Sequence, residues 1–204
     1  MTQLLELPQG KRVWFSADHH FNHKNIIRFT GRPYSSLWHM NSDMVRRHNA
    51  VVAPDEVFIQ CGDLALGDFE EALEFASQLN GIKYIKPGNH ERVSVAMRQR
   101  AGSFERFTAM YEAAGYTVLP EVGATTIELD GQLFDVSHYP HIGDHTERDR
   151  HVALRPKDTG RPLIHGHIHT LRKTSGRMFN VGVDVNDFTP VSSDEILAWA
   201  ATLA

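Results

Sequence analysis

Histidines gather in three short stretches of this sequence, and this clustering limits the chemistry of the chain more than any other feature. The chain has 13 histidines among 204 residues, and nine of them form three groups of three. Histidine is the commonest metal ligand and transfers protons near neutral pH, so the clustering predicts metal chemistry. The groups are His19, His20 and His23, then His138, His141 and His145, and finally His165, His167 and His169.

Hydrophobic periodicity predicts alternating strands and helices in the first half of the chain. Short apolar runs predict the strands, and apolar residues spaced three and four apart predict the helices. Asn41 is expected to cap the first helix, and Asp68 and Glu71 are expected to form a capping box at the second. The predicted strands cover residues 11–17, 56–60 and 82–85, and the predicted helices cover 41–52, 68–80 and 103–114.

Strands predominate in the second half. Alternating apolar and polar residues around Asp130-Gly131 predict a hairpin of strands over 125–129 and 133–137. Further strands are expected over 163–165 and 178–185, and a last helix is expected to begin near Ser192. The whole pattern predicts one α/β domain over residues 1–204, with stacked sheets flanked by helices. The polar residues 141–161 are expected to form a mobile surface loop within it.

Five short segments place metal-binding groups directly after predicted strands. Ligands of open α/β sheets bind outside the carboxyl ends of the strands, so these segments can converge on one site. Asp18 and His20 would point the same way in an extended segment and could reach one ion. Each segment alone also fits a structural turn or a hydrogen-bonded histidine, but together they favour a metal site. The segments are Asp18-His19-His20, Gly62-Asp63, Gly88-Asn89-His90, His138 and Gly166-His167-Ile168-His169.

This ordered set resembles the calcineurin-like metallophosphoesterase superfamily, whose pattern is D-x-H, G-D, G-N-H, a lone H and G-H-x-H. The resemblance spans Asp18 to His169 and fills every position of that pattern. The runs FNHKNII and NVGVDV are similar to a small, single-domain bacterial or phage branch. The resemblance implies two stacked mixed β-sheets between outer helices, an α/β/β/α sandwich.

The resemblance also implies a site for two metal ions, in which Asp63 bridges both. Nitrogen and oxygen ligands without a thiolate suit Mn²⁺, Fe²⁺/Fe³⁺, Zn²⁺, Co²⁺ or Ni²⁺, and Mn²⁺ is the ion we expect. The implied ligands of one ion are Asp18, His20 and His169, and those of the other are Asn89, His138 and His167.

The function that the resemblance implies is a dinuclear metal-dependent phosphohydrolase, with diesters favoured as substrates. Metal binding lowers the pKa of water from 15.7 toward ~7, so a hydroxide bridging the ions could attack phosphorus in line. His90 would stabilise the transition state or protonate the leaving oxygen. A 2′,3′-cyclic nucleotide is the specific substrate we expect. The alternatives are a phosphomonoesterase acting on nucleotides or phosphoproteins, a nuclease acting on long strands, and a non-catalytic scaffold on the same fold.

Basic side chains near the metal motifs favour an anionic substrate. Residues 24–47 hold five basic side chains against one acidic, 92–107 hold four against one, and 161–177 hold four against none. Solvated surface arginines are the alternative interpretation. His23 and Arg28 are candidates for phosphate contact, and a capped loop would explain them equally. The expected partner is a small phosphorylated molecule, such as a nucleotide or a nucleic-acid end.

The remaining polar and reactive residues are expected to have structural, supporting or surface positions. Cys61 is expected to pack at a strand end, whereas Gly182 and Asp184 could either support the metal site or serve ordinary strand and turn roles. We expect His141, His145 and His151 on the surface of the 141–161 loop, and the alternative is that one of them contacts the substrate. Structural roles are expected for His39, His48 and His165.

Composition excludes some classes of protein. The net charge of −4 argues against a protein that coats DNA, and one cysteine fits a reducing compartment. Residues 1–12 lack the pattern of a secretory signal, and the longest apolar stretch, residues 196–204, is too short to span a bilayer. A cytoplasmic protein without a membrane partner is the expectation.

Overall fold

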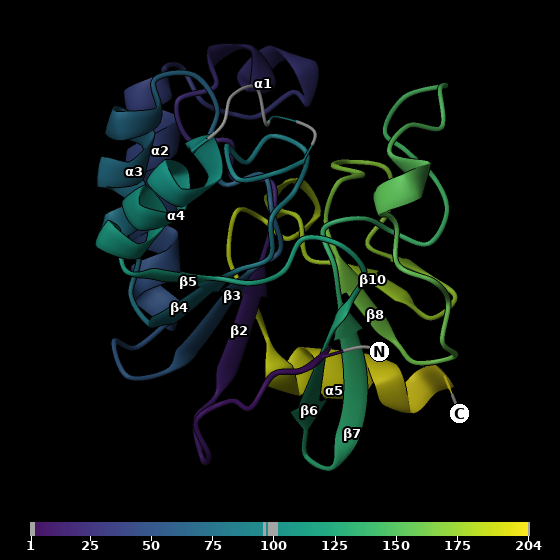
Figure 1. The fold of residues 1–204 in the computed structure, drawn as a ribbon. Coiled ribbons are helices and arrows are strands. Elements are labelled where there is room, and N and C mark those ends of the chain that lie inside the picture. Colours follow the sequence, from purple (N-terminus) through teal and green to yellow (C-terminus); the bar gives the residue numbers. More distant parts are fainter. Residues whose placement is uncertain (1–2, 96, 98–101, 204) are drawn as a thin grey trace.

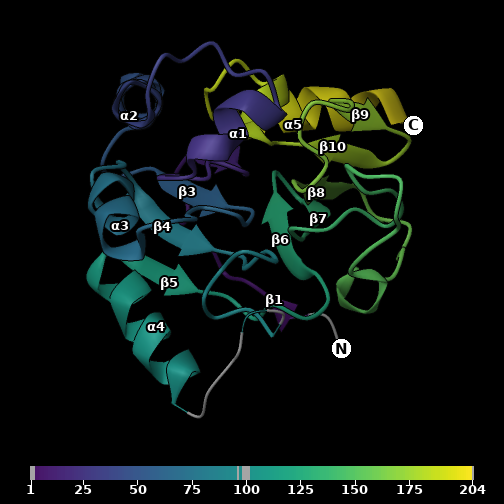
Figure 2. The ribbon, with the colours of Figure 1, turned by 90° about the horizontal axis from the view of Figure 1, so that it is seen from above.

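Two β-sheets stack face to face in the computed structural model, and helices cover the outer side of one sheet (Figure 1). The structure describes residues 3–95, 97 and 102–203. Seen from above, helices α2 (Leu37–Val51), α3 (Phe69–Ser77) and α4 (Ser103–Ala113) lie along one flank, and the second sheet lies beyond the first (Figure 2). This arrangement confirms the predicted α/β fold of two stacked mixed sheets flanked by helices.

The five-stranded sheet has the order β11-β2-β3-β4-β5, and four of its strands are parallel. Every residue of β2 and β3 is buried, as expected for parallel strands that are covered on both faces. The helices α2, α3 and α4 provide the crossovers. The strands are β2 (Val13–Ser16), β3 (Val57–Gln60), β4 (Ile82–Ile85), β5 (Tyr116–Val118) and the antiparallel edge strand β11 (Val191–Ser192).

The six-stranded sheet has the order β1-β6-β7-β8-β10-β9. The predicted hairpin is present, and its two turn residues, Asp130 and Gly131, both have positive φ angles of 48° and 80°, as a type I′ turn requires. The strands are β1 (Gln3–Leu4), β6 (Thr125–Leu129), β7 (Gln132–Val136), β8 (Leu163–His165), β9 (Thr174–Ser175) and β10 (Met178–Asn180).

Two apolar cores hold the layers together. One lies between the five-stranded sheet and its helices, and the other lies between the two sheets. Helix α5 (Ser193–Ala200) closes the second core, because it packs on β2 and β11 while Trp199 meets Phe179 of β10 at a ring-centroid distance of 5.2 Å. Full burial of one large apolar side chain stabilises the folded state by ~1.5–3 kcal/mol. Because each core buries many such side chains, the two sheets are held in a fixed position relative to each other.

Three element predictions are corrected by the structure. Helix α2 begins four residues before Asn41, because the Ser36 hydroxyl caps it by accepting a hydrogen bond from the His39 amide. Helix α3 ends at Ser77 rather than residue 80. The strand predicted over 178–185 ends at Asn180, and a 3₁₀ turn, η2 (Val183–Val185), follows.

The capping box at α3 is half formed. The Asp68 carboxylate accepts a hydrogen bond from the Glu71 amide, as predicted. The Glu71 carboxylate instead accepts a hydrogen bond from the side chain of Asn22 at 2.8 Å. Helix α1 (Lys24–Phe29), two further 3₁₀ turns, η1 (Val152–Leu154) and η3 (Ala201–Leu203), and the strands β1, β5, β9 and β11 were not predicted.

The carboxyl ends of the central strands meet at one edge of the sandwich. Strands β2, β3 and β4 run parallel, and so do β7 and β8 of the other sheet. In Figure 1, α1 and the segment 141–161 both stand above this edge. Within the part of the chain that the structure describes, no helix has the length and apolarity needed to cross a membrane.

Candidate metal centre

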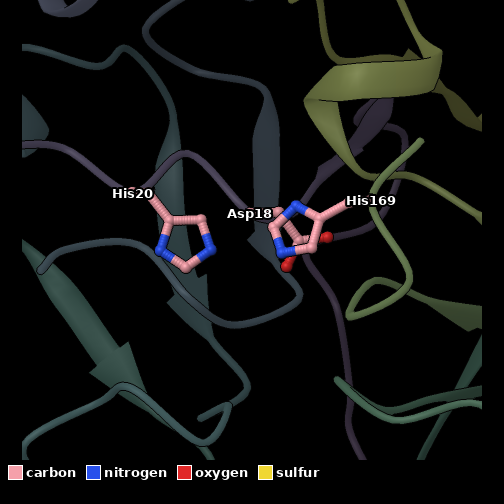
Figure 3. A group of neighbouring side chains, drawn as sticks. All are labelled: Asp18, His20 and His169. Atoms are coloured by element: carbon pink, nitrogen blue, oxygen red, sulfur yellow. The ribbon is translucent and has the colours of Figure 1, made fainter. Parts of the chain in front are cut away.

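Asp18, His20 and His169 form a buried group of potential metal ligands. One ligand atom from each lies within 4.8 Å of the others, and all three side chains are buried. The rings of His20 and His169 are stacked with centroids 5.2 Å apart. Figure 3 shows the three side chains converging from the segment after β2 and the segment after β8. The predicted convergence of the first and last motifs is therefore present.

The backbone that carries these side chains is left-handed, not extended. Asp18 and His20 have φ angles of 60° and 52°. Their amides donate hydrogen bonds to the carbonyl oxygens of Gly62 and Asp63, both at 3.0 Å, so the first motif is fixed to the second. The assumption of an extended Asp-x-His segment was wrong, although both side chains reach the site. His169 has the same left-handed backbone, with φ of 46°.

A second group of side chains adjoins the first. The Nε2 atom of His138 lies 3.2 Å from Asn89 Oδ1 and 3.2 Å from His167 Nδ1. Asp63 lies between the two groups, because its Oδ2 atom is 3.6 Å from His138 Nε2 and 3.7 Å from His20 Nε2. The other six residues of the expected ligand set therefore lie in one cluster with Asp63.

Several buried polar atoms of the first group lack a hydrogen-bond partner within the described residues. They are Asp18 Oδ1 and both ring nitrogens of His20. An unsatisfied buried polar atom costs ~1–3 kcal/mol, and a bound cation would remove that cost for an oxygen or a nitrogen lone pair. Together with the oxygen and nitrogen chemistry of the donors, this shows that the residues fit a metal ion. Groups of His and Asp that can bind metal are thus present.

Burial and the neighbouring imidazoles shift the pKa values of the carboxyl groups in this centre. Burial raises the pKa of Asp18 to about 6. Burial acts the same way on Asp63, but the imidazoles of His138, His90 and His20 outweigh it and hold the pKa of that carboxyl well below its usual value. A site that keeps one buried carboxylate ionised beside several imidazoles offers a cation both charge and lone pairs.

Glycines of the motifs allow the backbone to approach the ligands closely. A Cβ atom added at Gly62 would lie 2.4 Å from His138 Nδ1. One added at Gly88 would lie 2.5 Å from Asp63 Oδ1. Only glycine fits at either position without displacing a candidate ligand.

His90 lies at the open side of the centre. Its amide donates a hydrogen bond to Asp63 Oδ1 at 3.0 Å, and its side chain remains 35% exposed. The imidazole Nε2 is 3.9 Å from Asp63 Oδ2, and the ring centroid is 5.4 Å from that of His20. The side chain is near the candidate ligands and accessible to a substrate.

The two candidate phosphate contacts are placed differently. His23 lies against the centre, with its ring centroid 5.5 Å from that of His20. Arg28 is exposed on α1. Residues 24–47 and 161–177 offer fewer free cations than their composition indicated, because many of their arginines and lysines form ion pairs. Examples are Arg32 with Asp184, Arg46 and Arg47 with Asp43, Arg161 with Asp135, Lys173 with Glu195 and Arg177 with Asp158.

Glu91 is a buried residue that the sequence analysis did not single out. Its carboxylate accepts hydrogen bonds from the amides of Asp63, Leu64 and Gly88 at 2.8, 2.7 and 2.5 Å. Burial and the charge of Asp63 raise the pKa of Glu91 to about 7. Glu91 thus ties the loop after β3 to the loop after β4. Its position directly after the Gly-Asn-His motif was the available signal.

Arg32 and Asp184 hold the first group from behind. The Arg32 guanidinium donates to the carbonyl oxygens of Asp18 and His19 at 2.7 and 2.8 Å and to Asp184 at 2.7 Å. The other Asp184 oxygen lies 2.9 Å from His169 Nδ1. Such a carboxylate orients a ligating imidazole and directs its other nitrogen toward the metal. The supporting role considered for Asp184 fits this geometry.

The segment 141–161 contributes to the centre. His145 is exposed, as expected, whereas His141 and His151 are partly buried. Asp144 is buried, and its Oδ2 atom is 3.4 Å from His167 Nε2. The rings of His145 and His151 lie 5.4 and 5.7 Å from that of His167. The side chain of His141 is 12% exposed. Asp144, His145 and His167 form a further group that could hold an ion.

The other residues assigned structural positions are placed as follows. His48 is buried, and its Nε2 lies 2.9 Å from the Asn80 carbonyl oxygen. His165 is buried beside the Gly166 carbonyl oxygen, whereas His39 is exposed. Cys61 is fully buried, burial raises the pKa of its thiol, and its carbonyl oxygen lies 2.9 Å from His138 Nδ1. That contact directs His138 Nε2 toward the centre.

Comparison with known proteins gives relatives over nearly the whole length. The chain is 30% identical to the Gene 66 protein of Mycobacterium phage L5 over 194 residues, which cover 90% of this chain and 91% of that protein. It is 27% identical to an uncharacterized protein of Methanocaldococcus jannaschii over 189 residues, covering 92% of this chain and 90% of that protein. No family model matches.

One solved structure supports the fold. A protein of unknown function from Aquifex aeolicus matches with a TM-score of 0.69 and 23% identity, covering 93% of this chain and all of that one. A phosphopantetheinyl hydrolase from Mycobacterium tuberculosis matches with a TM-score of 0.36 and 18% identity, over 67% of this chain and 44% of that one. The second similarity is too low to show a shared fold.

Proposed function

We propose that this chain, which belongs to the same family as the Gene 66 protein of Mycobacterium phage L5, is a phosphodiesterase that uses two metal ions. Mn²⁺ is the proposed ion, and the donor set also suits Fe²⁺/Fe³⁺, Zn²⁺, Co²⁺ and Ni²⁺. A small phosphorylated molecule, such as a 2′,3′-cyclic nucleotide or a nucleic-acid end, is the proposed substrate.

The position of Asp63 is the observation that supports this proposal most strongly. Its carboxylate is within 4 Å of imidazoles from both groups of candidate ligands. Two ions held ~3.5–4 Å apart are the arrangement used for in-line displacement at phosphorus, and a shared carboxylate suits that separation. In the proposed set, Asp18, His20 and His169 would hold one ion, Asn89, His138 and His167 would hold the other, and Asp63 would serve both.

Residues of the chain have distinct parts in the proposed reaction. When bound, the ions would supply Lewis acidity toward phosphate oxygens and make a water molecule more acidic. The Cys61 carbonyl, Asp144 and Asp184 orient His138, His167 and His169. His90, partly exposed beside Asp63, would donate a proton to the leaving oxygen or stabilise the charge of the transition state.

Two chromogenic esters test this proposal. We expect protein reconstituted with Mn²⁺ to hydrolyse bis-p-nitrophenyl phosphate with a higher kcat/KM than p-nitrophenyl phosphate, and EDTA to stop both reactions. Asp63→Asn protein, purified in parallel, controls for contaminating phosphatases.

The result decides between the candidate activities. A higher kcat/KM for the monoester would favour a phosphomonoesterase. No hydrolysis of either ester with Mn²⁺, iron, Zn²⁺, Co²⁺ or Ni²⁺ would contradict a catalytic function.

A further inference from the structure

Phe29 presents a large apolar ring to solvent at the last residue of α1. Its exposed fraction is 63%, whereas Ile26, one turn earlier, is 4% exposed and packs in the core. Ile26 therefore anchors the helix, and the core does not need the ring of Phe29. A single exposed apolar residue is common on proteins, so the significance of Phe29 depends on its surroundings.

A row of three rings connects the candidate metal centre to Phe29. The centroid of His20, a candidate ligand, lies 5.5 Å from that of His23. The centroid of His23 lies 6.1 Å from that of Phe29, and these two rings are nearly perpendicular, at 75°. The exposed ring is therefore separated from a candidate ligand by one imidazole only.

One cation lies against the exposed ring, and a second lies on the same helix. The guanidinium carbon of Arg28 lies 5.4 Å from the Phe29 centroid, and Lys24 lies at the start of the same helix. Both side chains are exposed, and among the described residues neither forms an ion pair. Arg32 and Arg46, which also lie within residues 24–47, do form ion pairs. Unpaired cations at this position would attract an anionic ligand toward the ring.

The residues around α1 are fixed relative to the centre. The Arg32 amide donates to the Ile27 carbonyl oxygen at 2.9 Å, and the Arg32 guanidinium donates to the carbonyl oxygens of Asp18 and His19. The guanidinium is buried and paired with Asp184. The end of α1 is thus fixed to the segment that carries Asp18 and His20. A ligand subsite on α1 needs such a rigid connection to the centre.

We propose that Phe29, with the His23 ring at its edge, is a stacking surface for the nucleobase of a nucleotide whose phosphate lies at the metal centre. Arg28 and Lys24 attract the negative charge of that nucleotide. Aromatic rings stack with every base, so the subsite distinguishes a nucleotide from a phosphate ester without a base rather than one base from another. The position of the phosphate rests on the proposed function, and the inference narrows the substrate to nucleotides.

Binding tests the subsite without turnover. Calorimetry on protein reconstituted with Mn²⁺ compares AMP, a monoester that a diesterase does not hydrolyse, with ribose 5-phosphate, in which a hydroxyl replaces the base. We expect wild-type protein to bind AMP about tenfold more tightly, Phe29→Ala to lose this preference and Phe29→Trp to keep it. Trp38→Ala, which removes another exposed aromatic ring, is the matched control and should keep the preference. The subsite is contradicted if wild-type protein shows no preference, or if Phe29→Ala retains it.

Turnover provides the second test. Thymidine 5′-(p-nitrophenyl phosphate) and methyl p-nitrophenyl phosphate release the same leaving group, but only the first carries a base. Phe29→Ala should lower kcat/KM about tenfold for the thymidine ester, mainly through KM, and less than twofold for the methyl ester. Equal losses for both esters would contradict the subsite. Failure of wild-type protein to hydrolyse either ester would contradict the proposed function, and the binding ratio would still decide the subsite.

Discussion

Left-handed backbone at the site residues is a feature that their side chains alone do not reveal. Asp18, His20, Asp63, His167 and His169 all have φ between 46° and 74°. A non-glycine residue in this region costs of order 1–3 kcal/mol and persists only where the surrounding structure holds it. Buried hydrogen bonds such as those of Arg32 and Glu91 provide that restraint. The residue types of the motifs were visible in the sequence, but this turned conformation was not.

Replacing His90 tests its part in the reaction. His90→Ala is expected to lower kcat by ~10²–10⁴-fold, the usual contribution of general acid catalysis, while both ions remain bound. Steady-state kinetics and elemental analysis on the same preparation measure the two quantities. Asp63→Ala is the comparison, because it should lose metal as well as activity. Unchanged turnover in His90→Ala would remove this residue from the mechanism.

Buried neutral histidines predict how stability changes with pH. Burial lowers the pKa of His48 from 6.5 to about 4, so the unfolded chain takes up a proton there before the folded chain does. The free energy of unfolding is therefore unaffected by the protonation of His48 above pH 6.5, and it decreases as the pH falls from 6.5 toward 4. His48→Gln should reduce the slope of the unfolding free energy by up to ~1.4 kcal/mol per pH unit in this window.

Denaturant unfolding between pH 4 and 7, with EDTA present, measures that slope. The exposed His39, on the same helix, provides the control His39→Gln. A slope that is the same in wild-type and His48→Gln protein would contradict the assignment of His48 as a histidine that is buried in its neutral form.

Elements were predictable where a buried apolar pattern defined them. Strands β2, β3 and β4 read as apolar runs, and α3 and α4 as apolar stripes, because burial imposes these patterns. Helix α1 has six residues, and Ile26 is its one buried residue. Its sequence therefore lacks the repeated apolar positions that predict a helix. Residues 141–161 are irregular apart from η1, and most of them are exposed. The sequence did not indicate that Asp144 is buried within them and contacts Arg150 and His167.

The contribution of this segment is tested through Asp144. Asp144→Asn keeps the size of the side chain but removes the charge near His167 and Arg150. Loss of such an orienting carboxylate typically costs 10–100-fold in metal affinity, and we expect a loss of that order here. Metal titration measures the affinity, and excess metal should recover much of the activity. Asp149→Asn, an exposed change in the same segment, is the control and should bind metal normally. Normal affinity in Asp144→Asn would show that the 141–161 segment does not support the centre.

The whole molecule brings together groups that lie far apart along the chain. Asp18 follows β2 of one sheet, His138 and His169 follow β7 and β8 of the other, and the core between the sheets keeps these strand ends adjacent. The order of motifs after predicted strands was sufficient to anticipate this convergence. Arg32 and Asp144 could not be recognised in the same way, because neither lies next to a motif in the sequence, whereas Glu91 directly follows one.

Anomalous diffraction from crystals grown with Mn²⁺ tests whether the centre holds two ions. We expect two peaks ~3.5–4 Å apart, one beside Asp18, His20 and His169, the other beside Asn89, His138 and His167, with the Asp63 carboxylate contacting both. A single ion bound by Asp144, His145 and His167, or no ion near Asp63, would contradict the two-ion centre.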